Sequence, residues 1–217
     1  MKDYAILVEN VTKTYGEHIV LSDVSIRFEK NKIHGLIGRN GSGKTMLLKC
    51  ICGLTPVSMG KITVNGKMLG KDTDIAPNVG IIIETPGFLP NYTGYHNLKF
   101  LADINRVVSK EQIRAVIQRV GLNPDSKKKV SQYSLGMRQR LGIAQAIMEN
   151  PSVLLLDEPL NGIDKQGVQE IRELFLQLRN EGITIVLASH NKDDIELLCD
   201  CIYEIDDGIL QRSKQIP

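Results

Sequence analysis

Short apolar runs and stretches of helical periodicity alternate along most of the 217-residue chain. Runs of four or more apolar residues are typical of buried strands, and apolar residues that recur every three or four positions are typical of helices packed on a core. Strands that alternate with helices predict an α/β fold with a mainly parallel sheet. Asn65-Gly66 and Asp207-Gly208 predict hairpin turns. The expected strands cover residues 5–8, 20–28, 33–37, 61–64, 79–83, 153–156, 183–188, 202–205 and 209–210.

The stretch from residue 93 to residue 149 has a helical period. Within it, Ser109 and Gln112 form a capping box, in which each side chain bonds the backbone N–H of the other residue, and they mark the start of a helix. We therefore expect one domain over residues 1–217, with a helical insertion at about 90–150. Further helices are expected over residues 46–52, 135–149, 166–179 and 195–199.

A glycine-rich loop between an expected strand and an expected helix carries the strongest chemical signal. It reads Gly-Arg-Asn-Gly-Ser-Gly-Lys-Thr and fits the phosphate-loop pattern G-x-x-x-x-G-K-[ST]. Its glycines let backbone amides approach phosphate, and the helix N-terminus adds a favourable dipole. We expect Lys44 to reach the β- and γ-phosphates and the Thr45 hydroxyl to bind Mg²⁺. The candidate nucleotide-binding residues of this loop are Gly38, Arg39, Asn40, Gly41, Ser42, Gly43, Lys44 and Thr45.

Four polar motifs, at Gly38, Glu84, Asp157 and His190, follow immediately on expected strands. Ligands of parallel sheets bind at the carboxyl ends of strands, so these motifs are expected to meet. Asp157 follows four apolar residues and has the setting of a carboxylate that holds Mg²⁺, while Glu158 can polarise the attacking water. His190 is placed to touch the γ-phosphate, although a lone histidine is more often a core residue.

Composition limits the partners, the cell compartment and the cysteine chemistry that we expect for this chain. A net charge of +2 gives no electrostatic reason to expect a nucleic-acid partner. No apolar run is long enough to span a membrane, and the N-terminus lacks the apolar region of a signal peptide, so we expect a cytoplasmic chain. The cysteines at positions 50, 52, 199 and 201 are expected to be buried, reduced thiols rather than a metal site.

Tyr15, in an expected turn, precedes the phosphate loop and can stack on a nucleobase, although tyrosine packs in cores more often.

In this order, the motifs resemble those of the ATP-binding cassette family, the ATPase subunits of ABC transporters. The resemblance covers nearly the whole chain. Residues 38–45 match Walker A, residues 153–157 match Walker B, and Tyr15 resembles the adenine-stacking aromatic residue. Glu158 matches the catalytic glutamate, and His190 matches the switch histidine. Residues 134–140 occupy the position of the signature motif, and residues 161–164 resemble the D-loop.

The resemblance implies a P-loop NTPase core with a mainly parallel sheet, an antiparallel β subdomain and a helical insertion. It implies that ATP, with Mg²⁺ as cofactor, is hydrolysed to power transport through a separate integral-membrane permease, which would hold the chain at the inner face of the cell membrane. It also implies a head-to-tail dimer in which one signature faces the partner's phosphate loop. The residues assigned by resemblance are Glu158 and His190 to catalysis, Thr45, Glu84 and Asp157 to Mg²⁺, and Tyr15, Glu84, Ser134, Gly136 and Asp164 to nucleotide.

The chain departs from the family pattern at two places. Leu135 and Met137 stand where the usual signature, Leu-Ser-Gly-Gly-Gln, has glycine and glutamine, and this bears on the ATP-bound dimer rather than on nucleotide binding. Glu84 stands where the family usually has glutamine. With residues 85–93 after it, Glu84 resembles the subgroup that exports bacitracin and lantibiotic peptides and gives the cell immunity to them.

Two other functions fit part of the pattern. A soluble ABC ATPase acting on ribosomes or DNA usually carries paired cassettes or long heptad insertions, and the chain shows neither. A P-loop kinase or GTPase would leave the motifs at Ser134 and His190 unexplained. The sequence therefore favours the ATPase subunit of a membrane exporter.

Overall fold

The computed structural model describes residues 3–215. The strands in this part are β1 (Tyr4–Tyr15), β2 (His18–Glu29), β3 (Ile33–Ile37), β4 (Met59–Val64), β5 (Lys67–Met68), β6 (Val79–Ile82), β7 (Val153–Asp157), β8 (Thr184–Ala188), β9 (Cys201–Asp206) and β10 (Ile209–Gln215). The helices are α1 (Lys44–Cys52), α2 (Gly94–Asn105), α3 (Lys110–Arg119), α4 (Leu135–Ile147), α5 (Lys165–Asn180) and α6 (Lys192–Leu198), with a 3-10 turn at Val130–Gln132.

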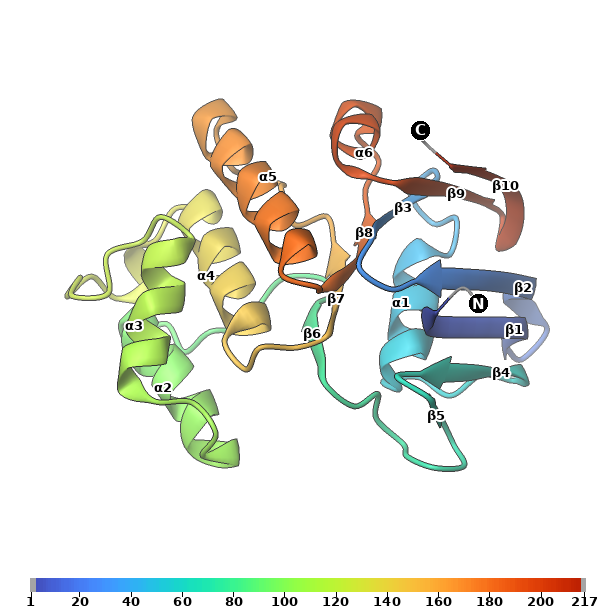
Figure 1. Ribbon diagram of the computed structural model, residues 1–217, viewed down its shortest axis with the longest axis horizontal. Helices are drawn as coiled ribbons and strands as arrows, with labels where there is room; N and C mark the ends of the chain where they lie inside the picture. Colours follow the sequence, from blue (N-terminus) through green and yellow to red (C-terminus); the bar gives the residue numbers. More distant parts are fainter. Residues whose placement is uncertain (1–2, 216–217) are drawn as a thin grey trace.

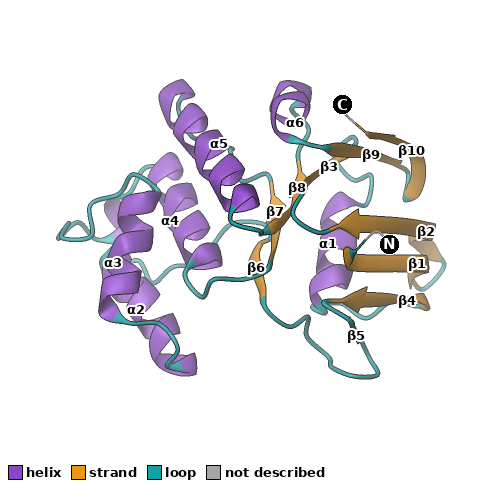
Figure 2. Cartoon of the chain, viewed as in Figure 1, coloured by secondary structure: helices purple, strands orange, loops and turns teal. Residues whose placement is uncertain are grey.

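These strands form two sheets (Figures 1 and 2). The larger sheet has the order β10-β9-β3-β8-β7-β6, in which β6, β7, β8, β3 and β9 run parallel and β10 is antiparallel at one edge. The smaller sheet is antiparallel, with the order β2-β1-β4-β5. Helices α2, α3 and α4 follow β6 and precede β7 in the chain, and they lie on the side of the molecule away from the smaller sheet (Figure 1).

Strand β7 shows why the core has two parts. Its side chains point alternately to opposite faces of the sheet, as in any strand. Leu154 and Leu156 pack with α4 and α5, while Val153 and Leu155 pack on the other face with α1 and the antiparallel sheet. All four residues are fully buried. The parallel sheet is therefore covered on both faces, as its continuous apolar strands require.

Two local features differ from the pattern-based expectations. The segment around Tyr15 is the end of a 12-residue strand and not a turn. Asn10 has a positive φ of 49°, and the pairing of β1 with β2 shifts beside it, which is a bulge that breaks the alternation of apolar residues. The sequence pattern does not predict helix α2 as a separate element. Only Leu98 and Ala102 bury apolar side chains along it while Phe100 and Ile104 are exposed, so its apolar residues do not follow a helical period.

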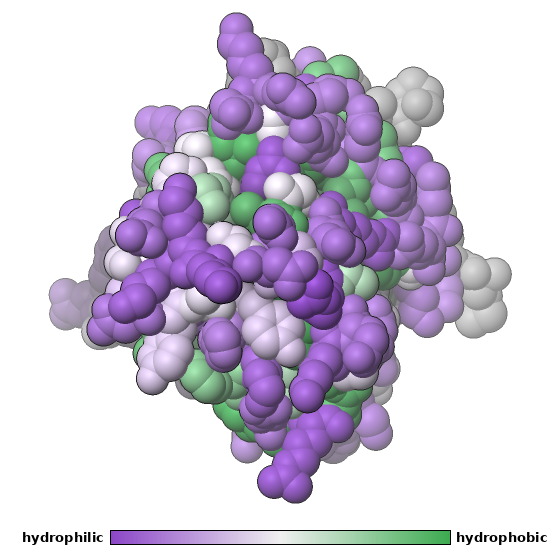
Figure 3. All heavy atoms as spheres, turned by 90° about the vertical axis from the view of Figure 1, so that its left-hand side faces the viewer, coloured by the Kyte–Doolittle hydropathy of each residue, from purple (hydrophilic) through white to green (hydrophobic). Residues whose placement is uncertain are grey.

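The surface on one side of the molecule is mainly hydrophilic (Figure 3), and the four cysteines lie in the interior. Seen from the side where α2, α3 and α4 lie, the surface is mainly hydrophilic, with smaller apolar patches between the polar side chains (Figure 3). Among the described residues, no helix is both long and apolar enough to cross a membrane. The four cysteines are buried and form no disulfide. Burial raises the pKa of the Cys50 thiol to about 11, so it stays protonated at neutral pH.

Candidate nucleotide-binding and hydrolysis site

The phosphate loop joins the carboxyl end of β3 to the N-terminus of α1. Gly38 has no room for a side chain, because a Cβ there would lie 2.1 Å from the carbonyl oxygen of Ile205. Gly43 is the N-cap of α1 and has no side chain to occupy the first amides of the helix. The Ser42 hydroxyl, also in this loop, is buried and has no hydrogen-bond partner within the described residues. Open amides and an orphaned hydroxyl fit the oxygens of a bound phosphate.

The two basic residues of the loop are held differently. Lys44 is buried, and its ammonium donates to the carbonyl oxygens of Gly38 at 2.7 Å and Arg39 at 3.0 Å. Burial lowers the pKa of Lys44, and the nearby carboxylates of Asp157 and Glu158 oppose this effect. The Arg39 guanidinium instead forms hydrogen bonds with Asp206, with Nη2 2.8 Å from Oδ1. Lys44 is therefore the cation of this loop that faces the acidic groups at the strand ends.

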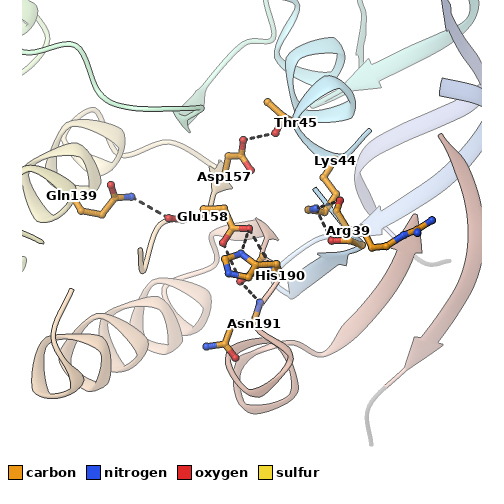
Figure 4. A network of polar contacts seen from close by, with 10 residues as sticks. Arg39, Lys44, Thr45, Gln139, Asp157, Glu158, His190 and Asn191 are labelled. Carbon is orange, nitrogen blue, oxygen red and sulfur yellow. Dashed lines mark hydrogen bonds and ion pairs between the residues drawn. The ribbon is translucent and has the colours of Figure 1, made fainter. Parts of the chain in front are cut away.

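Thr45 and Asp157 meet at the start of α1 (Figure 4). The Thr45 hydroxyl donates to Oδ2 of Asp157 at 2.7 Å. Burial raises the pKa of Asp157, while the hydrogen bond from Thr45 works in the opposite direction. A hydroxyl and a carboxylate are oxygen donors of the kind that Mg²⁺ takes. No group of three or more His, Cys, Asp or Glu side chains in residues 3–215 is arranged to hold a metal. These donors therefore fit an ion that also binds phosphate oxygens and water.

Glu158 and His190 form a hydrogen-bonded pair at the ends of β7 and β8 (Figure 4). Oε1 of Glu158 lies 2.7 Å from His190 Nδ1 and accepts the His190 backbone N–H at 3.0 Å. Ser189 donates its hydroxyl to Oε2 at 3.4 Å. The Glu158 backbone has a φ of 49° and donates its N–H to Ala188, which fixes the residue beyond the strand end. The pair is thus held by both strands and lies one residue away from Asp157.

Glu84 lies beyond β6 with a φ of 61°, and its side chain is 66% exposed. Its carboxylate is bonded to Lys49, on α1, and is not among the partners of Thr45 or Asp157. The structure thus brings two of the three expected metal ligands into contact. Sequence reasoning missed Lys49, although its position one helical turn after Thr45 places both side chains on one face of α1.

Tyr15 ends β1, and the residue is 53% exposed. Its hydroxyl contacts the sulfur of Met46 at 3.9 Å, which connects the ring to the helix of the phosphate loop. Lys13 lies over the ring of Tyr15, with Nζ 4.6 Å from the ring centroid. A half-exposed aromatic ring fixed beside the phosphate loop is suited to stack on a planar base.

The signature region begins at the N-terminus of α4. Ser134 is the N-cap, and its hydroxyl accepts the Met137 backbone N–H at 3.2 Å. A Cβ on Gly136 would lie 2.8 Å from the carbonyl oxygen of Gly162, so the signature region packs tightly on residues 161–164. Within that segment, Asp164 caps α5 by accepting the backbone N–H of Gly167. The Gln139 side chain donates to the backbone oxygen of Glu158 at 3.4 Å and links α4 to the hydrolysis site.

Comparison with known proteins decides the family. The pattern described as ABC transporter matches residues 21–161, which is more than half of the chain. The ABC transporter ATP-binding protein YybJ of Bacillus subtilis (strain 168) is 46% identical over 96% of each chain. The chain belongs to the ABC transporter family. Within this family, the bacitracin transport ATP-binding protein BcrA of Enterococcus faecalis is 43% identical over 99% of this chain and 70% of its own. The lantibiotic transport ATP-binding protein SrtF of Streptococcus pyogenes is 37% identical over 96% of this chain and 90% of its own.

Solved ABC transporter structures share the fold. A dimeric ATP-binding cassette in a post-hydrolysis state, bound to ADP and Pi, matches with a TM-score of 0.89 at 22% identity, over 98% of this chain and 99% of that one. The cbiO1 protein of Clostridium perfringens, part of the transporter complex cbiONQ, matches with a TM-score of 0.84 at 26% identity, over 99% of this chain and 89% of that one. The expected fold, an α/β core with a parallel sheet, an antiparallel sheet and added helices, is confirmed.

As a member of the ABC transporter family, the chain is an ATP-binding and ATP-hydrolysing subunit. The relatives named above are described as transporter components, and nothing in them favours a soluble ATPase acting on ribosomes or DNA. The kinase and GTPase alternatives are excluded by the family.

Proposed function

We propose that this ATPase powers the export of a peptide antibiotic, or a similar substrate, through a separate integral-membrane permease. The observation that carries the proposal is the 43% identity over 99% of the chain to a bacitracin transport ATP-binding protein. The lantibiotic transport relative and the acidic residue at position 84 support the same class of substrate.

The site geometry supports a division of roles among its residues. Lys44, the loop amides and the Ser42 hydroxyl bind the phosphates of ATP. Thr45 and Asp157 would hold Mg²⁺, which would neutralise negative charge on the phosphates of ATP. Glu158 takes up a proton from the attacking water, and His190 orients the Glu158 carboxylate through the 2.7 Å contact.

An apolar groove beside Glu84 is the proposed docking site for the permease. One part has a volume of about 730 Å³ and lies between the edge strand β6 and the ends of α2 and α4, with the exposed apolar residues Ile75, Ile104 and Val107 along it. A second part of about 270 Å³ contains Glu84 and shares Ile81 and Gln145 with the first. A cytoplasmic segment of the permease that enters this groove would contact the loop of Glu84 directly. The same docking would hold the chain at the inner face of the cell membrane as a peripheral subunit.

The head-to-tail dimer is part of the same proposal. Ser134 and Gly136 lie at a helix N-terminus, where backbone amides favour phosphate. In the dimer these residues, with Asp164, contact the ATP held by the phosphate loop of a second copy. A cassette of the same fold is dimeric with ADP and Pi bound, which supports dimerisation.

Export is tested in a strain that lacks this chain and carries its permease. The wild-type chain is expected to copurify with a hydrophobic integral-membrane protein and to restore resistance to bacitracin or a lantibiotic. Lys44→Ala removes the charge that clamps the β- and γ-phosphates and is expected to copurify without restoring resistance. Lys61→Ala, at an exposed lysine paired with Glu9 in the smaller sheet, is the matched control and is expected to behave as wild type. Wild-type resistance in the Lys44→Ala strain would contradict the assigned phosphate loop, and copurification with ribosomes instead would contradict the transport role.

A further inference from the structure

Lys13 is a buried cation next to the proposed base-binding residue. It lies in β1 with 8% of its surface exposed. Its ammonium donates to the backbone oxygen of Pro56 at 2.8 Å and lies over the ring of Tyr15, 4.6 Å from the centroid. A buried charge is costly unless it is compensated. The two partners that the structure gives this ammonium are a carbonyl oxygen and an aromatic face, and neither is a carboxylate.

The Tyr15 ring is fixed at two points. Lys13 and Tyr15 are two residues apart near the end of β1, and their side chains are in contact although the pairing of β1 with β2 shifts register between Lys13 and Thr14. Lys13 covers one face of the ring, and Met46 contacts its hydroxyl at 3.9 Å. Tyr15 as a whole residue is nevertheless 53% exposed. Because the ammonium lies over one face of the ring, the opposite face is the one that we assign to a planar ligand.

We propose that Lys13 is a positioning residue for the nucleobase of bound ATP. It holds the Tyr15 ring in one orientation and selects the face on which the base stacks. An ammonium on one face also draws π-electron density toward itself, which favours stacking of an electron-rich purine on the other face. The inference rests on the proposed ATP site. It adds a residue that affects binding of the nucleobase and not of the phosphates.

A purely structural role for Lys13 makes a different prediction. If Lys13 only secured the Pro56 loop, its loss would weaken the fold and would lower affinity for all ligands alike. A role through Tyr15 lowers affinity only for ligands that contain a base, and it disappears when the Tyr15 ring is absent. Comparing ATP with inorganic tripolyphosphate, which has the phosphates without the base, separates the two.

Ligand binding to purified variants provides the main test. Lys13→Met is expected to weaken ATP binding by about two- to thirty-fold, the range of a cation–π contact, and to leave tripolyphosphate binding unchanged. Lys13→Arg keeps a cation and is expected to retain most of the ATP affinity. In a Tyr15→Ala background, Lys13→Met is expected to have no further effect on ATP. Equal losses for both ligands, or additive losses in the double variant, would overturn the proposal. If the wild-type chain bound no ATP, the ATP site itself would fail, which is a separate result.

A fluorescent reporter tests the ring contact directly. The chain contains no tryptophan, so Tyr15→Trp places a single indole at the proposed stacking position. Lys13→Met in this background is expected to shift the emission before nucleotide is added and to reduce the change that ATP causes. Lys61→Met, on neighbouring β4, is the matched control and is expected to change neither signal. If Lys13→Met also leaves both signals as they were, Lys13 does not act through the ring.

Discussion

The ammonium of Lys49 lies 2.5 Å from Oε1 of Glu84. Lys49 lies one helical turn after Thr45 on α1. Its ion pair with Glu84 therefore connects α1 to the loop that follows β6. The negative charge that Glu84 brings, relative to glutamine at this position, is thereby paired. The contact also links α1, whose N-terminal end carries the proposed metal ligand Thr45, to the loop beside the proposed permease groove.

Substitutions at Glu84 and Lys49 test the role of this pair. If Glu84 has the metal-ligand role that the family resemblance implies, Glu84→Ala is expected to weaken Mg²⁺-dependent hydrolysis by about 10–100-fold, as for other lost partners of metal sites. Glu84→Gln keeps an oxygen and is expected to preserve ATP binding. If Lys49 acts through Glu84, Lys49→Met in the Glu84→Ala background is expected to have little further effect. Hydrolysis rates at several Mg²⁺ concentrations and the resistance phenotype check this. Wild-type values of both in Glu84→Ala would remove the role assigned to Glu84.

Glu158→Gln is expected to bind ATP and hydrolyse it poorly. The amide keeps the shape of the side chain and contacts to donors, but it does not take up a proton from water. An ATP-bound dimer is expected to accumulate, which light scattering measures in ATP and Mg²⁺. Turnover at the wild-type rate would exclude Glu158 as the base, whatever the oligomeric state.

Leu135→Ala tests the departure in the signature motif. Leu135 is 57% exposed and covers Gly162, where an added Cβ would lie 2.4 Å from its Cδ2 atom. Removing this side chain from the proposed dimer interface is expected to strengthen the ATP-bound dimer of the Glu158→Gln variant, with little loss of stability because alanine favours helix. Leu197→Ala, at an exposed leucine of α6, is the control. A weaker dimer in Leu135→Ala would mean that Leu135 contributes to the interface.

His34 predicts a loss of stability in acid. It is fully buried in β3, with Nε2 2.8 Å from the backbone oxygen of Glu29 and Nδ1 without a hydrogen-bond partner among the described residues. Burial lowers the pKa of His34 below its usual value of 6.5. The unfolded chain therefore binds the proton at a higher pH than the folded chain does. The contribution of His34 to the free energy of unfolding is complete above pH 6.5 and is lost as the pH falls from there toward the folded pKa.

Urea unfolding at about pH 7.5 and about pH 5.5 measures this contribution, whose slope for a single proton is at most about 1.4 kcal/mol per pH unit. His34→Gln keeps a donor for the Glu29 carbonyl and removes the titration, so its stability is expected to fall less in acid than that of the wild type. His18→Gln, at an exposed histidine, is the control. An equal acid loss in wild type and His34→Gln would assign the effect to other groups.

Local patterns predicted the elements of the fold because burial leaves a continuous apolar run in strands such as β7 and a helical period in helices such as α5. The capping box of Ser109 and Gln112 is present as predicted. The bulge at Asn10 and helix α2 were not predicted. The bulge interrupts the alternation of a strand, and the exposed apolar residues of α2 interrupt the helical period. Contacts such as Lys49 with Glu84 had no local signal, since the two residues lie on elements that only the folded sheet brings together.

The turn between β9 and β10 supports the phosphate loop from behind. Arg39 bonds Asp206 across 167 positions of sequence, the carbonyl oxygen of Ile205 lies against Gly38, and Gly208 donates its backbone N–H to Ser42. In a growing polypeptide that does not yet contain this turn, the Walker A loop lacks these three contacts. Contacts between residues so far apart in sequence carry a large loop-closure cost. We therefore expect a growing chain that ends before residue 205 to bind ATP more weakly than the chain that includes this turn.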